Sequence, residues 1–403
     1  MAAVLTGHLG TTVSVTTTTE APTRFRWDRL TYASALGYCM LVAGLSVGVV
    51  LGEIREEFEL NGVVAALHGS TFGIGLLAAG VWGVPLVDRI GRRRALLAAV
   101  TAIGLGVTLF CLGPAWPITL FGTALSGGGG ALLVMVMPGI ISDHHGEHRA
   151  TAFAAVNGAP GVAGLLFSLL IGAALGAGMS WRPPYLLLTV LFMAVLAVVA
   201  WPVAVPEAER AGSFSLAPLA QPKVLRPWLH IVNAVLTEFT VGIWAVTYLH
   251  EVGKASSGLA AVVASVFGIM MFVARMVLPR LLVRFGAATV SLSFLTIGSG
   301  ALVMCFAPGL PAKVLGLTIV GFGGGPLYPL TVDAFYAKAG DELDSVSMGA
   351  YCALASGAAV TLGPLAMGVL ADAVGLRWAI LVVPALALLG AITQRPRRAV
   401  RSY

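Results

Sequence analysis

The chain has 403 residues, of which 58% are hydrophobic and only 10% are charged, and its mean hydropathy is +0.92. Soluble domains are about 25% charged and about 45–50% apolar, so this composition excludes an ordinary soluble protein and indicates a membrane protein. The net charge is +6, but the basic residues recur as short clusters between apolar runs. That pattern argues against nucleic-acid binding and is typical of orientation in a bilayer.

Residues 1–30 are polar and rich in threonine, and they lack the apolar core of a signal peptide. A helix that crosses a bilayer needs about 20 largely apolar residues. Twelve stretches meet this requirement: 31–52, 62–86, 95–113, 117–141, 151–176, 183–205, 227–249, 258–280, 287–307, 311–336, 346–370 and 376–394. We expect α-helices, because backbone polar groups in lipid must be paired within their own segment. The predicted fold class is an all-α membrane protein.

The 24 Lys and Arg residues are distributed unevenly over the two sides of the predicted bundle. Most of them fall in the N-terminal tail, in the loops after the even-numbered spans and in the basic tail 395–403. The side richer in Lys and Arg is cytoplasmic by the positive-inside rule. Both termini are therefore predicted to lie in the cytoplasm, with the protein in the inner or plasma membrane.

The two halves of the chain resemble each other. "STFGI" at 70–74 matches "SVFGI" at 265–269, and "SGGGG" at 126–130 lies over "GFGGG" at 321–325, each at an offset of 195 residues. Two six-span repeats of the same orientation are predicted, as bundles over residues 31–205 and 227–394 joined by a cytoplasmic linker at 206–226. Parallel six-span repeats are typical of secondary transporters, whose substrate site lies near the midplane between them.

A charged stretch separates the second and third spans. "VPLVDRIGRR" is similar to the signature G-x-L-x-D-R-x-G-R-[RK] of the major facilitator superfamily, with Val84 in place of the first glycine. The matching positions are Leu86, Asp88, Arg89, Gly91, Arg92 and Arg93. The resemblance covers residues 30–395. It implies two pseudo-symmetric six-helix bundles and secondary active transport.

The same stretch has two interpretations. Its arginines could serve only as topology anchors. The resemblance also implies an inner-gate latch, in which Asp88 faces the cytoplasmic start of span eleven, near Asp341, Glu342 and Asp344. Free N–H groups at a helix N-terminus favour an anion. Arg284 stands at the equivalent of Arg89 in the second repeat.

Glu238 lies near the centre of span seven. An ionisable group at that depth is costly and usually functional, so we expect proton coupling or substrate contact there. The alternative is a structural glutamate bonded to Thr237 or Asn233.

Five further residues are candidates for proton coupling or substrate contact. Arg275 and Asp333 lie at similar depths in spans eight and ten, so they could form a structural or a gated ion pair. His68, alone in span two, is expected to form local hydrogen bonds more readily than to titrate. Tyr38 and Tyr328 are predicted cavity residues.

Other chemistry is not expected. The glycine runs lie inside spans and are not followed by Lys-Ser/Thr, so they predict close helix packing and no nucleotide site. The loop "DHHGEH" at 143–148 lacks the spacing of known zinc helices, so neither a metal nor a cofactor is predicted.

The leading functional hypothesis is a monomeric carrier that exports a small drug-like molecule or metabolite in exchange for protons. Proton-coupled uptake is the alternative. An enzyme or a channel is more remote, because the spans offer no catalytic constellation.

Overall fold

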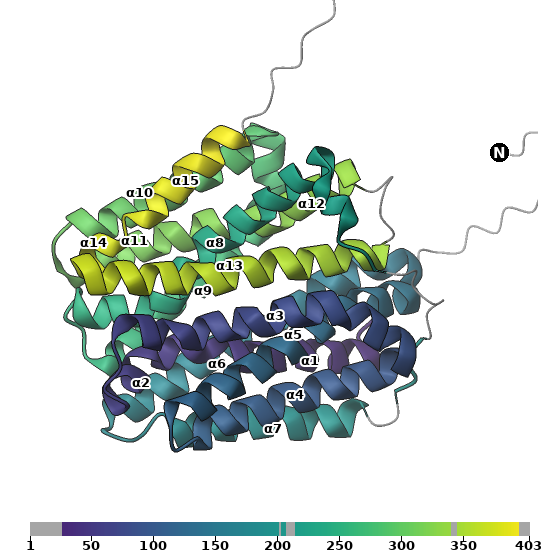
Figure 1. The fold of residues 1–403 in the computed structure, drawn as a ribbon, viewed down its shortest axis with the longest axis horizontal. Helices are drawn as coiled ribbons and strands as arrows, with labels where there is room; N and C mark the ends of the chain where they lie inside the picture. The colour runs from purple at the N-terminus through teal and green to yellow at the C-terminus, as the bar shows by residue number, and fades with distance from the viewer. Residues whose placement is uncertain (1–25, 201–202, 207–213, 340–344, 395–403) are drawn as a thin grey trace, which may run out of the picture.

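The computed structural model describes residues 26–200, 203–206, 214–339 and 345–394. Within these residues the secondary structure is entirely helical, and twelve helices are long and apolar enough to cross a membrane. This confirms the predicted number of spans. Figure 1 shows that the helices from α1 to α7 form one half of the molecule and those from α8 to α15 the other.

The N-terminal half contains nine described helical segments, of which two are 3-10 helices. They are α1 (Arg29–Leu45), η1 (Ser46–Val50), α2 (Leu51–Glu57), α3 (Gly62–Ile90), α4 (Arg92–Leu112), α5 (Trp116–His145), η2 (Gly146–His148), α6 (Arg149–Gly176) and α7 (Arg182–Ala200). The segments α1, η1 and α2 together make the first span, Arg29–Glu57.

The C-terminal half begins with a short 3-10 helix that precedes the seventh span. Its segments are η3 (Ala217–Ala220), α8 (Pro222–Glu251), α9 (Ser257–Phe285), α10 (Ala288–Phe306), α11 (Gly309–Gly324), α12 (Leu327–Ala339), α13 (Ser345–Val374), α14 (Leu376–Ala379) and α15 (Val382–Thr393). We call the end of the molecule that carries Arg92, Arg93 and Arg94 the arginine-rich face, and the end that carries Arg55 and Glu251 the opposite face.

Three of the predicted spans are interrupted. The first span tightens into the 3-10 helix η1 at Ser46–Val50, and the twelfth divides into α14 and α15 after Ala379. The tenth divides into α11 and α12 around Gly325 and Pro326. Proline has no backbone N–H and clashes with the carbonyl four residues earlier, so Pro326 and Pro329 together remove two hydrogen bonds from the helical ladder here. The span predicted for 311–336 is present, as Gly309–Ala339, with this break within it.

The duplicated positions adopt the same local structure. Gly91 ends α3 with φ of 80°, and Gly286 ends α9 with φ of 53°. A positive φ suits glycine, which has no Cβ to clash with the following carbonyl. The helix ends of the two repeats thus agree with the sequence repeat.

The glycine runs bring helices into backbone contact, as their sequence predicts. A Cβ on Gly321 would lie 2.5 Å from the Phe267 carbonyl oxygen of α9, and one on Gly127 would collide with Phe72 of α3. Phe72 and Phe267 are equivalent residues of the two repeats. Small residues allow such close approach between membrane helices.

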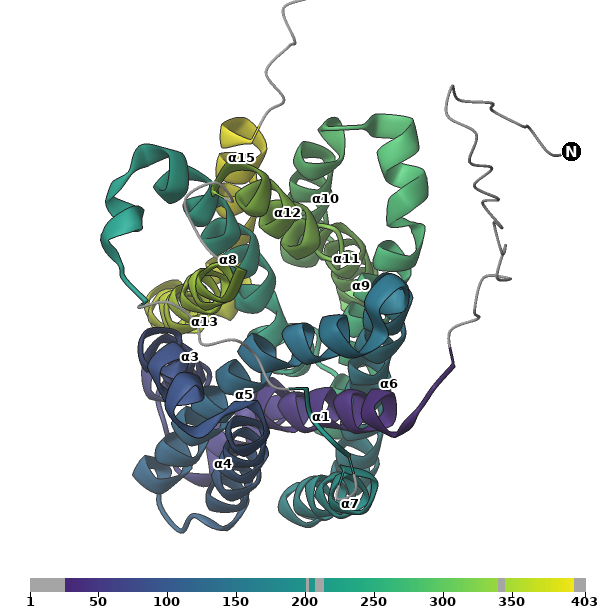
Figure 2. The ribbon, with the colours of Figure 1, turned by 90° about the vertical axis from the view of Figure 1, so that its right-hand side faces the viewer.

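Two antiparallel helix pairs join the halves. In the first, α3 packs along α13: Gly62 lies against Asp372, Gly73 against Thr361 and Gly80 against Leu354. Figures 1 and 2 show the two helices side by side. The second pair is α6 with α9, which meet near the opposite face. There a Cβ on Gly258 would lie 2.6 Å from the Gly172 carbonyl oxygen.

We predict that Gly321→Ala lowers the stability of the protein. The added methyl group would press on the backbone of α9, and overpacking of this kind costs about 1–3 kcal/mol. Thermal unfolding of the purified protein in detergent measures the effect. Gly349→Ala in α13 is the matched control, because a Cβ there meets nothing within 4 Å. An equal unfolding temperature for both variants would contradict the packing described above.

Candidate transport cavity

A cavity of about 340 Å³ lies between the two halves. Its walls come from α1, η1 and α6 on one side and from α8 and α9 on the other. Most of the lining is apolar and includes three phenylalanines, Phe239, Phe267 and Phe272. Small-molecule sites are typically mostly apolar clefts of about 300–1,000 Å³ with a few placed polar groups, so this cavity is at the small end of that range.

The interruption of the first span borders this cavity. Ser46 and Val49 of η1 are lining residues, and Gly48 approaches α8 so closely that a Cβ would lie 2.8 Å from the Ile243 carbonyl oxygen. A short stretch of 3-10 helix within a longer helix often marks a hinge. The first span therefore changes its helical form at the contact between the halves.

Glu238 lies near the middle of α8, is half-buried and lines the cavity. The sequence left open a bond to Thr237 or Asn233. The Thr237 hydroxyl instead donates to the Asn233 carbonyl oxygen at 2.7 Å, and the Asn233 amide donates to the Leu386 carbonyl oxygen at 3.3 Å. Among the described residues neither side chain donates to Glu238, whose carboxyl group lines the cavity.

Arg275 of α9 also lines the cavity, and its charge acts on the Glu238 carboxyl group. Its Nε donates a hydrogen bond to the Gly325 carbonyl oxygen at 3.2 Å. In an unbroken helix that carbonyl would accept from residue 329, but Pro329 has no N–H. The arginine therefore supplies the donor that the proline-rich break between α11 and α12 lacks.

The pairing expected between Arg275 and Asp333 is not observed. Asp333 is exposed on α12, and within the described ranges no ion pair joins it to Arg275. The reason is the free carbonyl of Gly325, which holds the guanidinium beside the helix break.

His68 is fully buried inside the N-terminal half, away from the cavity lining. Its Nε2 lies 2.8 Å from the Thr119 hydroxyl oxygen and its Nδ1 lies 3.2 Å from the Ala65 carbonyl oxygen. The local hydrogen bonding expected from sequence is therefore present.

Tyr38 and Tyr328 do not line this cavity. Tyr38 is buried on α1, and Tyr328 of α12 is half-buried and packs against the hydrophobic cluster that contains Tyr38. They are packing residues of this cluster in this conformation.

The signature residues occupy the arginine-rich face. Arg92 pairs with Asp143 at the end of α5, with 2.5 Å between Nη1 and Oδ2, and the guanidinium of Arg284 lies 5.5 Å from the Phe285 ring centre. Leu86 and Arg89 are exposed, and Asp88 is half-buried. The expected partners Asp341, Glu342 and Asp344 lie outside the described residues. The register of α3 against α13 places Asp88 level with the first turn of α13.

A second carboxylate contact, missed by the sequence reasoning, lies at the opposite face. Asp372, near the end of α13, accepts hydrogen bonds from the backbone N–H groups of Gly62 and Val63 at 2.8 and 2.9 Å. These are free donors at the N-terminus of α3, where the helix dipole also favours an anion. Arg55 of α2 pairs with Glu251 of α8 at 2.7 Å on the same face. Both contacts join the two halves.

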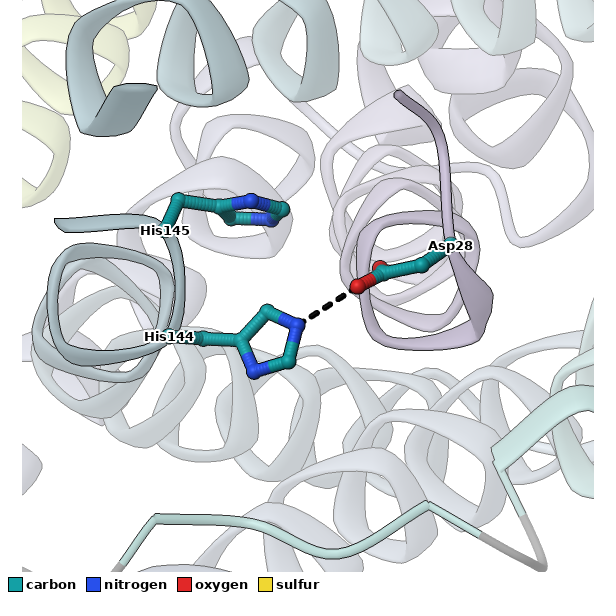
Figure 3. Close-up of side chains that lie close together, drawn as sticks. All are labelled: Asp28, His144 and His145. Atoms are coloured by element: carbon teal, nitrogen blue, oxygen red, sulfur yellow. Dashed lines mark hydrogen bonds and ion pairs between the residues drawn. The ribbon is translucent and has the colours of Figure 1, made fainter. Parts of the chain in front are cut away.

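Three potential metal ligands meet at the arginine-rich face (Figure 3). Asp28, His144 and His145 place their ligand atoms within 4.8 Å of one another, so they could hold a divalent cation. The sequence pointed only to the histidines, because Asp28 precedes α1 and lies far from them along the chain. Asp28 already serves as the N-cap of α1 and accepts hydrogen bonds from the N–H of Thr31 at 2.8 Å and from the His144 ring at 2.5 Å.

The hydrogen bonds decide the charge of Asp28. Burial alone would raise the pKa of its carboxyl group, but the bonds from the Thr31 N–H and hydroxyl and from His144 lower that pKa to about 2. The carboxylate therefore stays ionised at neutral pH and ties the start of α1 to the end of α5.

Two six-helix halves around a mostly apolar central cavity define a membrane carrier. The family model of the Major Facilitator Superfamily matches residues 32–352. The chain belongs to this superfamily. It is a secondary transporter for small molecules and not an enzyme.

Similar proteins agree with this assignment. An uncharacterized transporter of Salmonella typhimurium is 26% identical over 93% of this chain and 96% of its own length. An uncharacterized transporter of Sinorhizobium fredii is 32% identical, over 39% of this chain and 41% of its own length. The crystal structure of a point mutant of the nucleoside transporter NupG superposes with a TM-score of 0.73 at 13% identity, over 91% of this chain and 98% of that one. A bacterial homologue of the human lysosomal transporter Spinster gives a TM-score of 0.71 at 14% identity, over 91% and 94%.

We predict that Asp372→Ala weakens the closure of the opposite face. The loss of a carboxylate at a helix N-terminus costs about 1–2 kcal/mol, which changes a two-state population roughly 5- to 30-fold. Spin labels at Glu59→Cys and Leu259→Cys report the distance across this face by double electron–electron resonance. The population at longer distances should increase.

Asp143→Asn is the control for this experiment. It also removes a carboxylate contact, but that contact lies within the N-terminal half. An Asp372→Ala distance distribution equal to that of the control would show that the α13 contact does not hold the face closed.

Proposed function

We propose that the protein is a proton-coupled secondary transporter that works by alternating access, with Glu238 as its proton carrier. One observation carries the proposal: a membrane-embedded carboxyl group opens into the cavity between the two halves, beside an arginine. Intramembrane carboxyl groups that face a cavity typically serve ion or proton pathways.

The proposed orientation follows from the charges. The arginine-rich face is cytoplasmic, with both termini inside, and the opposite face is extracellular. The bodies that move are the two halves, residues 31–205 and 227–394. In this conformation the contacts of Asp372 and of Arg55 with Glu251 close the extracellular side.

The α3–α13 pair would act as a two-ended latch in this cycle. At the extracellular end, Asp372 of α13 binds the N-terminus of α3. At the cytoplasmic end the roles are reversed, since Asp88 of α3 is level with the N-terminus of α13. Breaking one contact while forming the other would exchange the side that is open, as alternating access requires.

Two modes of proton coupling can operate with one carboxyl group. In exchange, the mode favoured by the sequence, the proton and an exported compound occupy the cavity in turn. In co-transport, they bind together. Co-transport is the second candidate because Arg275 places a positive charge beside Glu238.

Coupled transport by purified protein in liposomes tests the proposal. A pH gradient is imposed, a panel of small apolar compounds is added, and a pH-sensitive dye trapped inside reports proton flux. We expect substrate-dependent proton movement, lost in Glu238→Gln because the amide cannot carry the proton. The sign of the flux relative to the substrate distinguishes exchange from co-transport.

Glu59→Gln is the matched control, since Glu59 is exposed in the loop between α2 and α3. It should keep wild-type flux. Proton flux in Glu238→Gln equal to that of this control would refute Glu238 as the proton carrier.

A further inference from the structure

The charge of the cavity constrains what it can bind. Among the residues that line it, only Glu238 and Arg275 ionise. The other acidic, basic and histidine side chains of α8, α9 and α12 lie outside the lining: Lys223, Arg226, His230, His250, Glu251, Arg280, Arg284, Asp333 and Lys338. The lining is therefore neutral when Glu238 is ionised and carries one positive charge when Glu238 is protonated. It is never negative, which disfavours an organic cation.

Arg275 is positioned to receive an anion. Its Nε–H is spent on the Gly325 carbonyl oxygen, which fixes the guanidinium plane. Within the described part of the chain the four Nη–H donors have no hydrogen-bond partner, and the side chain is exposed. A planar guanidinium with two adjacent donors matches a carboxylate, which it can bind in a bidentate manner.

The hydroxyl groups of the cavity add little competing donor capacity. Ser46 donates to the Val42 carbonyl oxygen at 2.8 Å, and Ser265 donates to the Val262 carbonyl oxygen at 2.6 Å. Both of these hydroxyl hydrogens are used within their own helices, and the third lining serine, Ser168 of α6, is a neutral donor. The charged donor offered to a ligand is therefore Arg275, and the ligand must bring the acceptor.

The apolar part of the cavity wall determines which group the rest of the ligand can carry. Phe239, Phe267 and Phe272 line the cavity with valine, leucine and isoleucine neighbours, and its volume is about 340 Å³. Such a wall binds a small aliphatic or aromatic group by burial of apolar surface. A strongly polar body would leave its hydrogen-bonding groups unpaired, at a cost.

From this arrangement we infer that the substrate is a small amphipathic monocarboxylate, bound through Arg275 in the same state that holds a proton on Glu238. The inference rests on the proposed function and names its substrate class. An ionised Glu238 neutralises Arg275 and repels a second carboxylate in a medium of low dielectric constant. A protonated Glu238 leaves the arginine free to bind it. The proton and the anion then cross together with no net charge, which is co-transport.

Ligand-induced stabilisation of the purified full-length protein tests the substrate class. The probes are two isosteric sets: phenylacetate, phenylacetamide and phenethylamine, and hexanoate, hexanamide and hexylamine. A ligand that binds the folded state raises the unfolding temperature with concentration, which yields Kd. We expect a carboxylate to bind at least tenfold more tightly than its amide, and the amines to bind more weakly still.

Variants assign the selectivity to named residues. Arg275→Gln should raise the Kd of the carboxylate roughly 10- to 100-fold, the value of a charge-assisted hydrogen bond. Arg280→Gln is the matched control, because Arg280 is exposed on the same helix and outside the lining. Glu238→Gln mimics the protonated acid and should retain carboxylate binding. In the wild-type protein the affinity for the carboxylate should fall at high pH, and this fall should be absent from the variant.

The inference is overturned if no carboxylate of either set binds more tightly than its amide. Wild-type affinity in Arg275→Gln, or lost carboxylate binding in Glu238→Gln, would also overturn it. These measurements use no pH gradient, so they are independent of the proton-flux assay. If carboxylates bind selectively but no proton flux is found, proton coupling is refuted and the monocarboxylate substrate class is retained.

Discussion

The rest of this structure depends on the rule that a backbone polar group inside a bilayer must find a partner within the protein. Continuous helices satisfy it, and most of the chain is built that way. Backbone groups lack a partner within their own helix where a helix begins and where proline interrupts it. At two such places the missing partner is a charged side chain from another helix: Asp372 at the start of α3 and Arg275 at the break before α12.

These two contacts differ in what they join, and this difference sets their roles. Arg275 and Gly325 both belong to the C-terminal half, so their bond can persist while the halves move. Asp372 and Gly62 belong to different halves, so their bond must break when the opposite face opens. One contact therefore holds a charge in place beside the cavity, and the other is available to stabilise one conformation over another.

Much of this arrangement follows from the sequence, and the rest depends on tertiary structure. Hydropathy predicts the twelve spans, the internal repeat predicts the two halves, and the isolation of Glu238 within an apolar run marks it for function. The partner of Arg275 could not be found in this way. An arginine and an aspartate at similar depths, Arg275 and Asp333, suggest an ion pair. The observed partner of Arg275 is instead the Gly325 carbonyl oxygen, which receives no hydrogen bond from Pro329. Likewise, Asp372 and Asp28 look like ordinary loop or end residues until the packing brings distant helix ends beside them.

The two halves contribute unequally to the cavity, although they share one fold. The C-terminal half supplies both ionisable groups, and the N-terminal half supplies small and apolar residues together with the 3-10 segment η1. In the proposed alternating-access cycle, a charge placed in only one half stays with that half as the other moves against it. Ligand and proton would then be held by α8 and α9 throughout the cycle. The 3-10 segment η1 and the glycines of α6 would change the walls around the ligand and the proton. Because the charges would stay on the same helices, the cost of desolvating them would not recur at each step.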